Sequence, residues 1–231
     1  MRAQQLHSWQ VTTHEARAIQ QRLARLVSTE AGPTVLQRVA GVDISSRGSR
    51  GDGVAAVVVL SFPQLELLEV QVITQQIGFP YVPGLLSFRE APLIAAACER
   101  LTTAPDLILV DGQGIAHPRR FGLASHLGLL LDVSTIGCAK SLLVGSHGPL
   151  DEAAGKYVEI THEGDVIGAA LRTRSGVRPV YVSIGHKVDL GSALSWTLGC
   201  CRGLRLPEPT RLAHLAANGR LTRDKQISAT K

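Results

Sequence analysis

The sequence predicts a mixed α/β fold in which helices cover both faces of a single sheet. Three apolar, β-branched runs near the N-terminus are separated by turn-like links, which indicates an antiparallel meander. Short apolar runs then alternate with helical patterns, an order typical of strands that continue the sheet in parallel. The run LILV, between Asp106 and Asp111, is short and wholly apolar, as expected of a central strand covered on both faces.

Each element follows from its own pattern. Residues 14–27 repeat apolar side chains at helical spacing, with Thr12 or Thr13 as the expected N-cap. The strands of the meander are expected at 34–45, 53–62 and 65–76, the next helix at 88–101, and the central strand at 106–112.

The second half alternates in the same way. A helix is expected at 123–133, a strand at 133–139, a hairpin at 156–164 and 165–173, and a strand at 178–186. Two helices follow at 189–201 and 207–219, the latter with Thr210 as cap and Gly219 as stop. No repeat or linker interrupts the chain, so we expect one domain over 1–231, with the final dozen residues frayed.

Composition narrows the class of protein. The 231 residues are 45% hydrophobic, which is too apolar for a disordered chain, and they carry a formal net charge of +5. This charge suits a polyanionic partner without identifying one. The longest apolar runs are too short to span a bilayer, and the N-terminus has no signal-like apolar region.

The four cysteines point to reduced thiols in a cytoplasmic protein. Cys98, Cys138, Cys200 and Cys201 form no C-x-x-C pair, so neither a zinc site nor a disulfide framework is indicated.

Three carboxylates occupy unusual positions. Asp43 interrupts an apolar strand, Asp111 ends another, and Glu90 lies near the start of a helix. Singly, Asp111 fits a strand-end turn and Glu90 a first helical turn, whereas an Asp within a strand is disfavoured. Together they offer three hard oxygen donors, which suit Mg²⁺ or Mn²⁺ and the in-line cleavage of a phosphodiester.

Several longer motifs, in order, resemble those of the endonuclease V family. They are DIS at 43–45, PYVPGLLSFRE at 80–90, LVDGQGIAHPRRFGLASHLG at 109–128, GCAKSLL at 137–143 and LPEPTRLAH at 206–214. The resemblance covers nearly the whole chain and implies an RNase H-like fold. It also implies a Mg²⁺- or Mn²⁺-dependent cut at the second phosphodiester bond 3′ to deoxyinosine, leaving 3′-hydroxyl and 5′-phosphate ends and the base in place.

The resemblance also implies catalytic roles. Asp43, Glu90 and Asp111 would hold the metal, Lys140 would stabilise charge near the scissile phosphate, and His214 would orient or deprotonate water. From spacing alone, Lys140 is equally a surface lysine and His214 an exposed helix residue.

By the same resemblance, the loop Pro80, Tyr81, Val82 and Pro83 would be a wedge that enters the duplex beside the lesion. Val82 stands where the family commonly has isoleucine, a change we expect to be mild. The alternative is a crossover loop with Tyr81 packed into the core.

A pocket for the flipped base and a set of phosphate contacts complete the expected site. The pocket residues are Gly84, Leu85, Gly112, Gln113, Gly114, Ile115 and His117. The phosphate contacts are Arg89, Arg119 and Arg120, with Arg89 alternatively paired to a carboxylate.

The expected partner is damaged DNA, double- or single-stranded, acted on by a monomer that needs no membrane. Three alternatives stay open: preference for inosine-containing RNA, a non-catalytic nucleic-acid-binding protein on the same fold, and another RNase H-like nuclease. A junction resolvase or an RNase H should lack the PYVP motif and the Gly112–Gly114 loop.

Overall fold

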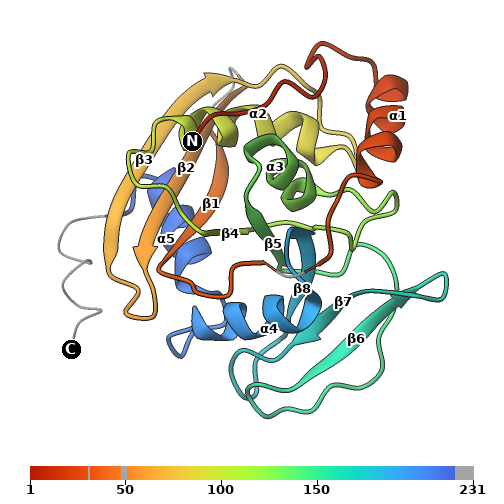
Figure 1. Ribbon diagram of the computed structural model, residues 1–231, viewed down its shortest axis with the longest axis vertical. Coiled ribbons are helices and arrows are strands. Elements are labelled where there is room, and N and C mark those ends of the chain that lie inside the picture. The colour runs from red at the N-terminus through yellow and green to blue at the C-terminus, as the bar shows by residue number, and fades with distance from the viewer. Residues whose placement is uncertain (31, 48–50, 222–231) are drawn as a thin grey trace.

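The computed structural model describes residues 1–30, 32–47 and 51–221, which fold around one eight-stranded sheet (Figure 1). The strand order is β3-β2-β1-β4-β5-β8-β7-β6. The strands are β1 (Arg38–Arg47), β2 (Asp52–Ser61), β3 (Leu67–Gln76), β4 (Leu107–Val110), β5 (Ser134–Ala139), β6 (Tyr157–His162), β7 (Asp165–Leu171) and β8 (Val180–His186). The helices are α1 (Thr13–Ala24), α2 (Leu86–Glu99), α3 (Leu123–Leu131), α4 (Leu190–Gly199) and α5 (Glu208–Ala217).

The predicted meander is confirmed, because β2 pairs antiparallel with both β1 and β3. β4 and β5 continue the sheet in parallel with β1, as predicted. β8, β7 and β6 complete it through antiparallel pairs, and β6 and β7 form the expected hairpin. The parallel strands therefore lie in the middle of the sheet.

The four residues of β4 show why the sheet is covered on both faces. Leu107 and Leu109 face a core that includes residues of α4 and α5. Ile108 and Val110 face a second core, which α2 and α3 cover. Because successive side chains of a strand point to opposite faces, an all-apolar strand needs a helical layer on each side. α1 lies apart from both layers and packs through Ala16 on the segment before α2.

Several boundaries differ from the expected ones. β1 begins at Arg38, not at residue 34, because the Asp106 carboxylate accepts hydrogen bonds from the backbone N–H groups of Gln37 and Arg38, at 3.0 and 2.8 Å. Thr210 is not a cap: α5 begins at Glu208, and the Thr210 hydroxyl donates to the Pro207 carbonyl oxygen within the first turn. Prolines at 207 and 209 lack the N–H groups that a cap would satisfy, so the helix starts without one.

Other helix ends match the sequence. Thr12 forms a capping box with Glu15, and Asp189 caps α4 through the Ser192 N–H. Gly219 follows α5 with φ +66, the left-handed conformation of a helix stop. The expected fraying at the C-terminus concerns residues that lie almost wholly outside the described part, which ends at 221.

Two further expectations concern the state of the cysteines and the presence of a membrane-spanning helix. All four cysteines are free thiols, as predicted. Within the described ranges, no helix combines the length and the apolar character that a membrane crossing requires.

Gly41 is the point at which α5 crosses β1. A Cβ at this position would lie 2.0 Å from the carbonyl carbon and oxygen of Pro209, so only glycine allows this approach. We expect Gly41→Ala to lower the free energy of unfolding by about 1–3 kcal/mol through overpacking. Chemical denaturation measures the change. Gly148→Ala is the control, since a Cβ there meets nothing within 4 Å; equal stability of the two variants would contradict the packing.

Candidate active site at the carboxyl ends of the central strands

Asp43 and Asp111 lie side by side on neighbouring parallel strands. β1 and β4 are in register at Val42 and Val110, so the next residue of each chain is an aspartate. Both directly follow a valine that faces the α2–α3 core, and their side chains therefore point to the face that α5 covers. The register of β1 and β4 thus brings these two carboxylates together, as predicted.

α5 brings His214 to this pair. Its start is fixed on Gly41, two residues before Asp43, and the helix then runs past the strand end. His214 Nδ1 lies 2.8 Å from Asp43 Oδ2. About half of the histidine side chain is exposed, while the aspartate is largely buried. His214 is an exposed helix residue, as its spacing indicates, and it also contacts the Asp43 carboxylate.

Lys140 follows β5, the next parallel strand. Its Nζ donates to Asp111 Oδ2, with the lysine partly exposed and the aspartate largely buried. Three consecutive parallel strands thus deliver Asp43, Asp111 and Lys140 to one edge, because the carboxyl ends of parallel strands meet there.

Glu90 enters from the second turn of α2. Burial, then the negative charges of Asp43 and Asp111, raise its pKa to about 7, against a smaller opposing effect of Arg89. Burial and the charge of Asp111 also raise the pKa of Asp43, partly offset by His214 and Lys140. Asp43 and Glu90 therefore both carry a raised pKa that the nearby cations do not fully offset.

These residues can be tested as a metal site. As placed, no group of three or more His, Cys, Asp or Glu side chains within the described residues is gathered closely enough to hold an ion. Asp111 is turned to Lys140 and Asp43 to His214. Two features fit a hard divalent cation: the donors are carboxylate oxygens, and the excess negative charge that raises the pKa of Glu90 would be offset by such an ion.

A pocket of about 340 Å³ opens beside Asp111 and Lys140. Its lining includes three wedge residues and four of the predicted pocket residues. The lining residues are Tyr81, Val82, Pro83, Gly84, Leu86, Asp111, Gly112, Gln113, His117, Leu123, Ala139, Lys140, Ser141 and Leu143. The loop 80–83, the segment 112–113 and two of the strand-end residues, Asp111 and Lys140, thus share one cavity.

The loop 80–83 stands out from the surface. Tyr81 is 71% exposed, and the prolines on either side are exposed as well. Val82 packs toward the small core of Phe79, Leu85 and Phe88, which anchors the base of the loop. The alternative in which Tyr81 packs into the core is therefore wrong.

Three of the residues predicted for the pocket do not line it. Leu85 is fully buried in the core below the loop. Gly114 packs against β8, where a Cβ would lie 1.9 Å from the Ile184 carbonyl oxygen. Ile115 packs against the core on the α4–α5 face and lines a separate hollow near Arg120.

His117 is buried and held from both ring nitrogens. Nδ1 accepts a hydrogen bond from the Arg119 backbone N–H, so Nε2 carries the proton and donates it to the Gly84 carbonyl oxygen at 3.0 Å. Burial, then the charge of Arg119, lowers the pKa of His117 to about 4. The imidazole is therefore neutral near pH 7.

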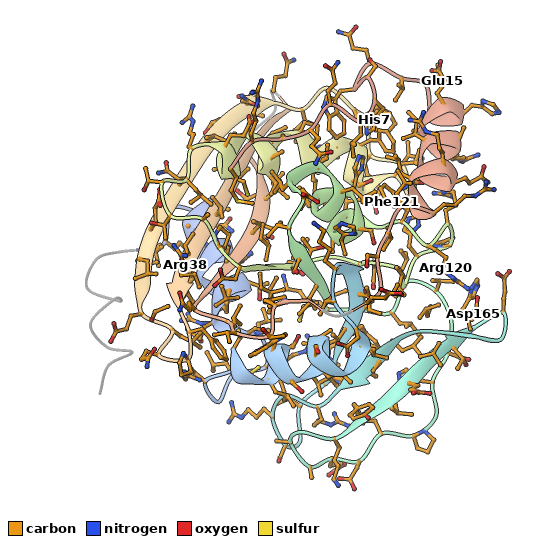
Figure 2. All side chains as sticks on the ribbon, viewed as in Figure 1. His7, Glu15, Arg38, Arg120, Phe121 and Asp165 are labelled. Atoms are coloured by element: carbon orange, nitrogen blue, oxygen red, sulfur yellow. The ribbon has the colours of Figure 1, made fainter. Side chains whose placement is uncertain are left out.

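The three arginines predicted to contact phosphate bind the chain itself. Arg89 donates to the Phe79 carbonyl oxygen, and Arg119 donates to Gly84 and Gln20. Arg120 donates to His162 and pairs with Asp165 of the β6–β7 hairpin (Figure 2). Each of these guanidinium groups thus holds a loop or segment of the chain, and its contact with phosphate stays a prediction.

Gln20 is the buried residue of this region that the sequence reasoning missed. It lies on the apolar face of α1 with Ala16 and Leu23, and it is fully buried. A glutamine on the buried face of an amphipathic helix is itself a signal, because a buried amide needs hydrogen-bond partners.

Comparison with known proteins identifies the family. The model of the family described as Endonuclease V matches residues 20–215. The endonuclease V of Gloeobacter violaceus is 54% identical over 216 residues, covering 92% of this chain and 88% of that protein. The solved endonuclease V of Streptomyces avermitilis is 43% identical with a TM-score of 0.87, and the match covers 97% of both chains.

A more distant structure carries a nucleic acid. Endonuclease V of Ciona intestinalis, solved as a variant in complex with a 23mer DNA containing an inosine followed by a ribo-adenosine, is 26% identical with a TM-score of 0.79. That match covers 90% of this chain and 98% of the other. The solved structures confirm the expected RNase H-like fold, and the chain belongs to the endonuclease V family.

Proposed function

We propose that this chain is a DNA repair endonuclease that recognises deaminated bases, chiefly deoxyinosine. It hydrolyses the second phosphodiester bond 3′ to the lesion and leaves 3′-hydroxyl and 5′-phosphate ends. The observation that carries the proposal is the shared site. Asp111 lines a pocket together with the exposed Tyr81, and burial and the charges of Asp43 and Asp111 raise the pKa of Glu90 beside it. The position of the cut and its products follow from the family resemblance.

Asp43, Glu90 and Asp111 would hold Mg²⁺, with Mn²⁺ as a substitute. The ion would supply an activated water and neutralise charge on the leaving oxygen. The buried position of Glu90 supports this role, because Arg89 offsets its charge only in part and a bound cation would add the missing counter-charge.

Lys140 and His214 act beside the carboxylates. Lys140 is partly exposed at the pocket wall, where its ammonium can stabilise negative charge on a bound phosphate. His214 Nδ1–H donates to Asp43, which leaves Nε2 free to accept a proton from water. The carboxylate thus fixes the tautomer that general-base chemistry requires.

The pocket beside Tyr81 would receive the flipped base. Hypoxanthine offers O6 and N7 as acceptors and N1–H as a donor, whereas adenine lacks that O6 and N1–H. Gln113 lines the pocket, and its Oε1 has no donor among the described residues, while its Nε2 donates to the Ser141 carbonyl oxygen. A polar wall that pairs only with the correct edge gives selectivity, because the wrong base leaves its groups unpaired.

Inosine-containing RNA is the second candidate substrate. The oligonucleotide bound by the Ciona protein has a ribo-adenosine directly after the inosine, so that relative accommodates a ribose next to the lesion. As the alternative to a preference for DNA, we propose that this chain also accepts a ribonucleotide next to the lesion and cleaves inosine-containing RNA.

A cleavage assay tests both candidates. Matched DNA and RNA oligonucleotides with one inosine, and their adenine counterparts, are incubated with the enzyme and Mg²⁺ or with EDTA. We expect one cut in the inosine strand, directly 3′ of the nucleotide that follows the lesion, and no cut with EDTA. Cleavage in EDTA, or equal cleavage of the adenine controls, would contradict the proposed function.

Tyr81→Ala is expected to weaken recognition of the lesion. Loss of one base-stacking aromatic should lower affinity for an inosine duplex about tenfold, with little effect on an undamaged duplex. Fluorescence anisotropy with both duplexes measures the change. The matched control is Tyr157→Ala, an exposed tyrosine on β6, at the edge of the sheet. An equal loss of affinity for both duplexes would show that Tyr81 does not read the lesion.

A further inference from the structure

The Gly84 carbonyl oxygen is held by three side chains at once. It accepts hydrogen bonds from Gln20 Nε2 at 3.1 Å, His117 Nε2 at 3.0 Å and Arg119 Nη2 at 2.7 Å. Gly84 lies directly after the wedge loop and two residues before α2 begins. The base of the loop is therefore tied to α1 and to the segment 117–119.

Gln20 is the centre of this arrangement. Besides Gly84, its Nε2 donates to the Phe121 carbonyl oxygen at 3.1 Å, and its Oε1 accepts from Arg119 Nε at 2.5 Å. Both amide protons and the amide oxygen are thus engaged, although the side chain is fully buried. Phe121, labelled in Figure 2, lies just before α3, so one amide joins α1 to the two segments that form the pocket.

The local hydrogen bonds of the turn at Gly84 are too few to fix its orientation without these side-chain contacts. α2 begins after Leu85, which makes no capping hydrogen bond through its side chain. One backbone hydrogen bond closes the turn, from the Leu85 N–H to the Val82 carbonyl oxygen at 2.9 Å, and Val82 packs on the small core below it. Gly84 has φ +75, and a Cβ there would lie 2.8 Å from Arg119 Nη2. The orientation of the turn thus depends on donors from elsewhere in the chain.

We propose that Gln20 is a positioning residue for lesion recognition. Its amide fixes the Gly84 carbonyl and the Arg119 guanidinium, and through them it holds Tyr81 over the mouth of the pocket. It acts through Gly84 and Arg119, which sets it apart from the catalytic residues. This inference rests on the proposed function of the loop as a wedge.

The role predicts a specific kinetic pattern. Without the amide, the loop adopts other orientations, so capture of the lesion weakens. Once the lesion is captured, Asp43, Glu90 and Asp111 act as before. Loss of a positioning contact should therefore raise the enzyme concentration at half-maximal rate and leave the maximal single-turnover rate unchanged.

The variants Gln20→Met and Gln20→Glu distinguish hydrogen bonding by the Gln20 amide from packing of its side chain in the core. Methionine keeps the length and approximate volume of the side chain but removes all three of its hydrogen bonds. Glutamate keeps the oxygen that accepts from Arg119 but cannot donate to the carbonyl oxygens of Gly84 and Phe121. Gln21→Met is the matched control, since Gln21 is the next residue of the same helix and is exposed.

The variants are compared in single-turnover cleavage of an inosine duplex with Mg²⁺, and by hydrogen–deuterium exchange without nucleic acid. Gln20→Met and Gln20→Glu should raise the half-maximal concentration about tenfold with a maximal rate within twofold of wild type. Exchange should quicken in residues 79–88 and stay unchanged in β1 and β2. Gln21→Met should match wild type in both measurements.

Two results would overturn the inference. One is an unchanged half-maximal concentration with unchanged exchange in residues 79–88. The other is a fall in maximal rate alone. Absence of cleavage by the wild-type protein would instead reject the proposed function, and the exchange measurement would still decide whether Gln20 holds the loop.

Discussion

Asp111→Asn is expected to reduce nicking of an inosine duplex about 1,000-fold or more while leaving the fold intact. Asp111 ends β4 between Asp43 and Lys140 and is largely buried at the pocket edge. Asparagine keeps the shape but removes the charge that a divalent cation requires, and an interaction of several kcal/mol in the transition state corresponds to such a loss of rate. Asp43→Asn should behave in the same way.

Stability is the complementary measurement for these variants. Lys140, which Asp111 faces, is partly exposed, so water can solvate it when the aspartate is neutralised. The raised pKa of Asp43 means that its ionised form is disfavoured by burial and by Asp111. We therefore expect unchanged stability in Asp111→Asn and unchanged or higher stability in Asp43→Asn, measured by denaturant unfolding.

Asp106→Asn is the matched control. Asp106 directly precedes the same strand, β4, at its opposite end, and its carboxylate accepts backbone hydrogen bonds from Gln37 and Arg38. An asparagine oxygen can accept the same bonds, so activity should persist. Wild-type activity in Asp111→Asn, or an equal loss in Asp106→Asn, would reject the carboxylate cluster as the catalytic centre.

Glu90→Gln is expected to stabilise the metal-free protein at high pH and not at low pH. The pKa of Glu90 is raised from 4.5 to about 7, with burial as the largest cause. Below pH 4.5 the carboxyl is protonated in both the folded and the unfolded chain and costs nothing. As pH rises through 7, the unfolded chain ionises first, so wild type loses stability that the glutamine variant retains. The difference corresponds to about 3 kcal/mol.

Urea unfolding of both proteins in EDTA, at pH 5 and at pH 8, measures this difference. Because burial lowers the pKa of His117 and His126, these residues make the folded protein less stable as pH falls. This contribution is the same in wild type and variant, so it cancels in the difference between them. Addition of Mg²⁺ at pH 8 should narrow the gap, because the cation binds the ionised carboxylate. A difference that does not change between pH 5 and pH 8 would contradict the shared electrostatics of the three carboxylates.

The sequence predicts the catalytic cluster because its members violate local patterns. Asp43 interrupts an apolar strand and Asp111 follows another. A carboxylate buried at such a position lowers stability, so its presence there indicates a role other than stability. The meander and the alternation of elements then predict that these strands are neighbours. The register of β1 and β4, which places the two aspartates at adjacent positions, follows from packing on both faces of the sheet.

The loop contacts could not be predicted in this way. A string such as HPRRF shows positive charge, but it does not show which carbonyl each guanidinium meets. The basic motif predicts that Arg119 binds phosphate, but nothing in the sequence links Arg119 to Gln20, 99 residues away. Likewise, the position of Arg120 beside the β6–β7 hairpin depends on where that hairpin joins the edge of the sheet.

The hairpin of β6 and β7 forms the edge of the sheet, four strands away from β4. β7 pairs with β8 only through the three positions from Ala169 to Leu171, and the tip at Glu163 and Gly164 adopts left-handed backbone conformations. Residue 164 is therefore a suitable insertion point for a reporter peptide or a fused protein. A label there would let the enzyme be followed on its substrate without altering the chemistry at the strand ends.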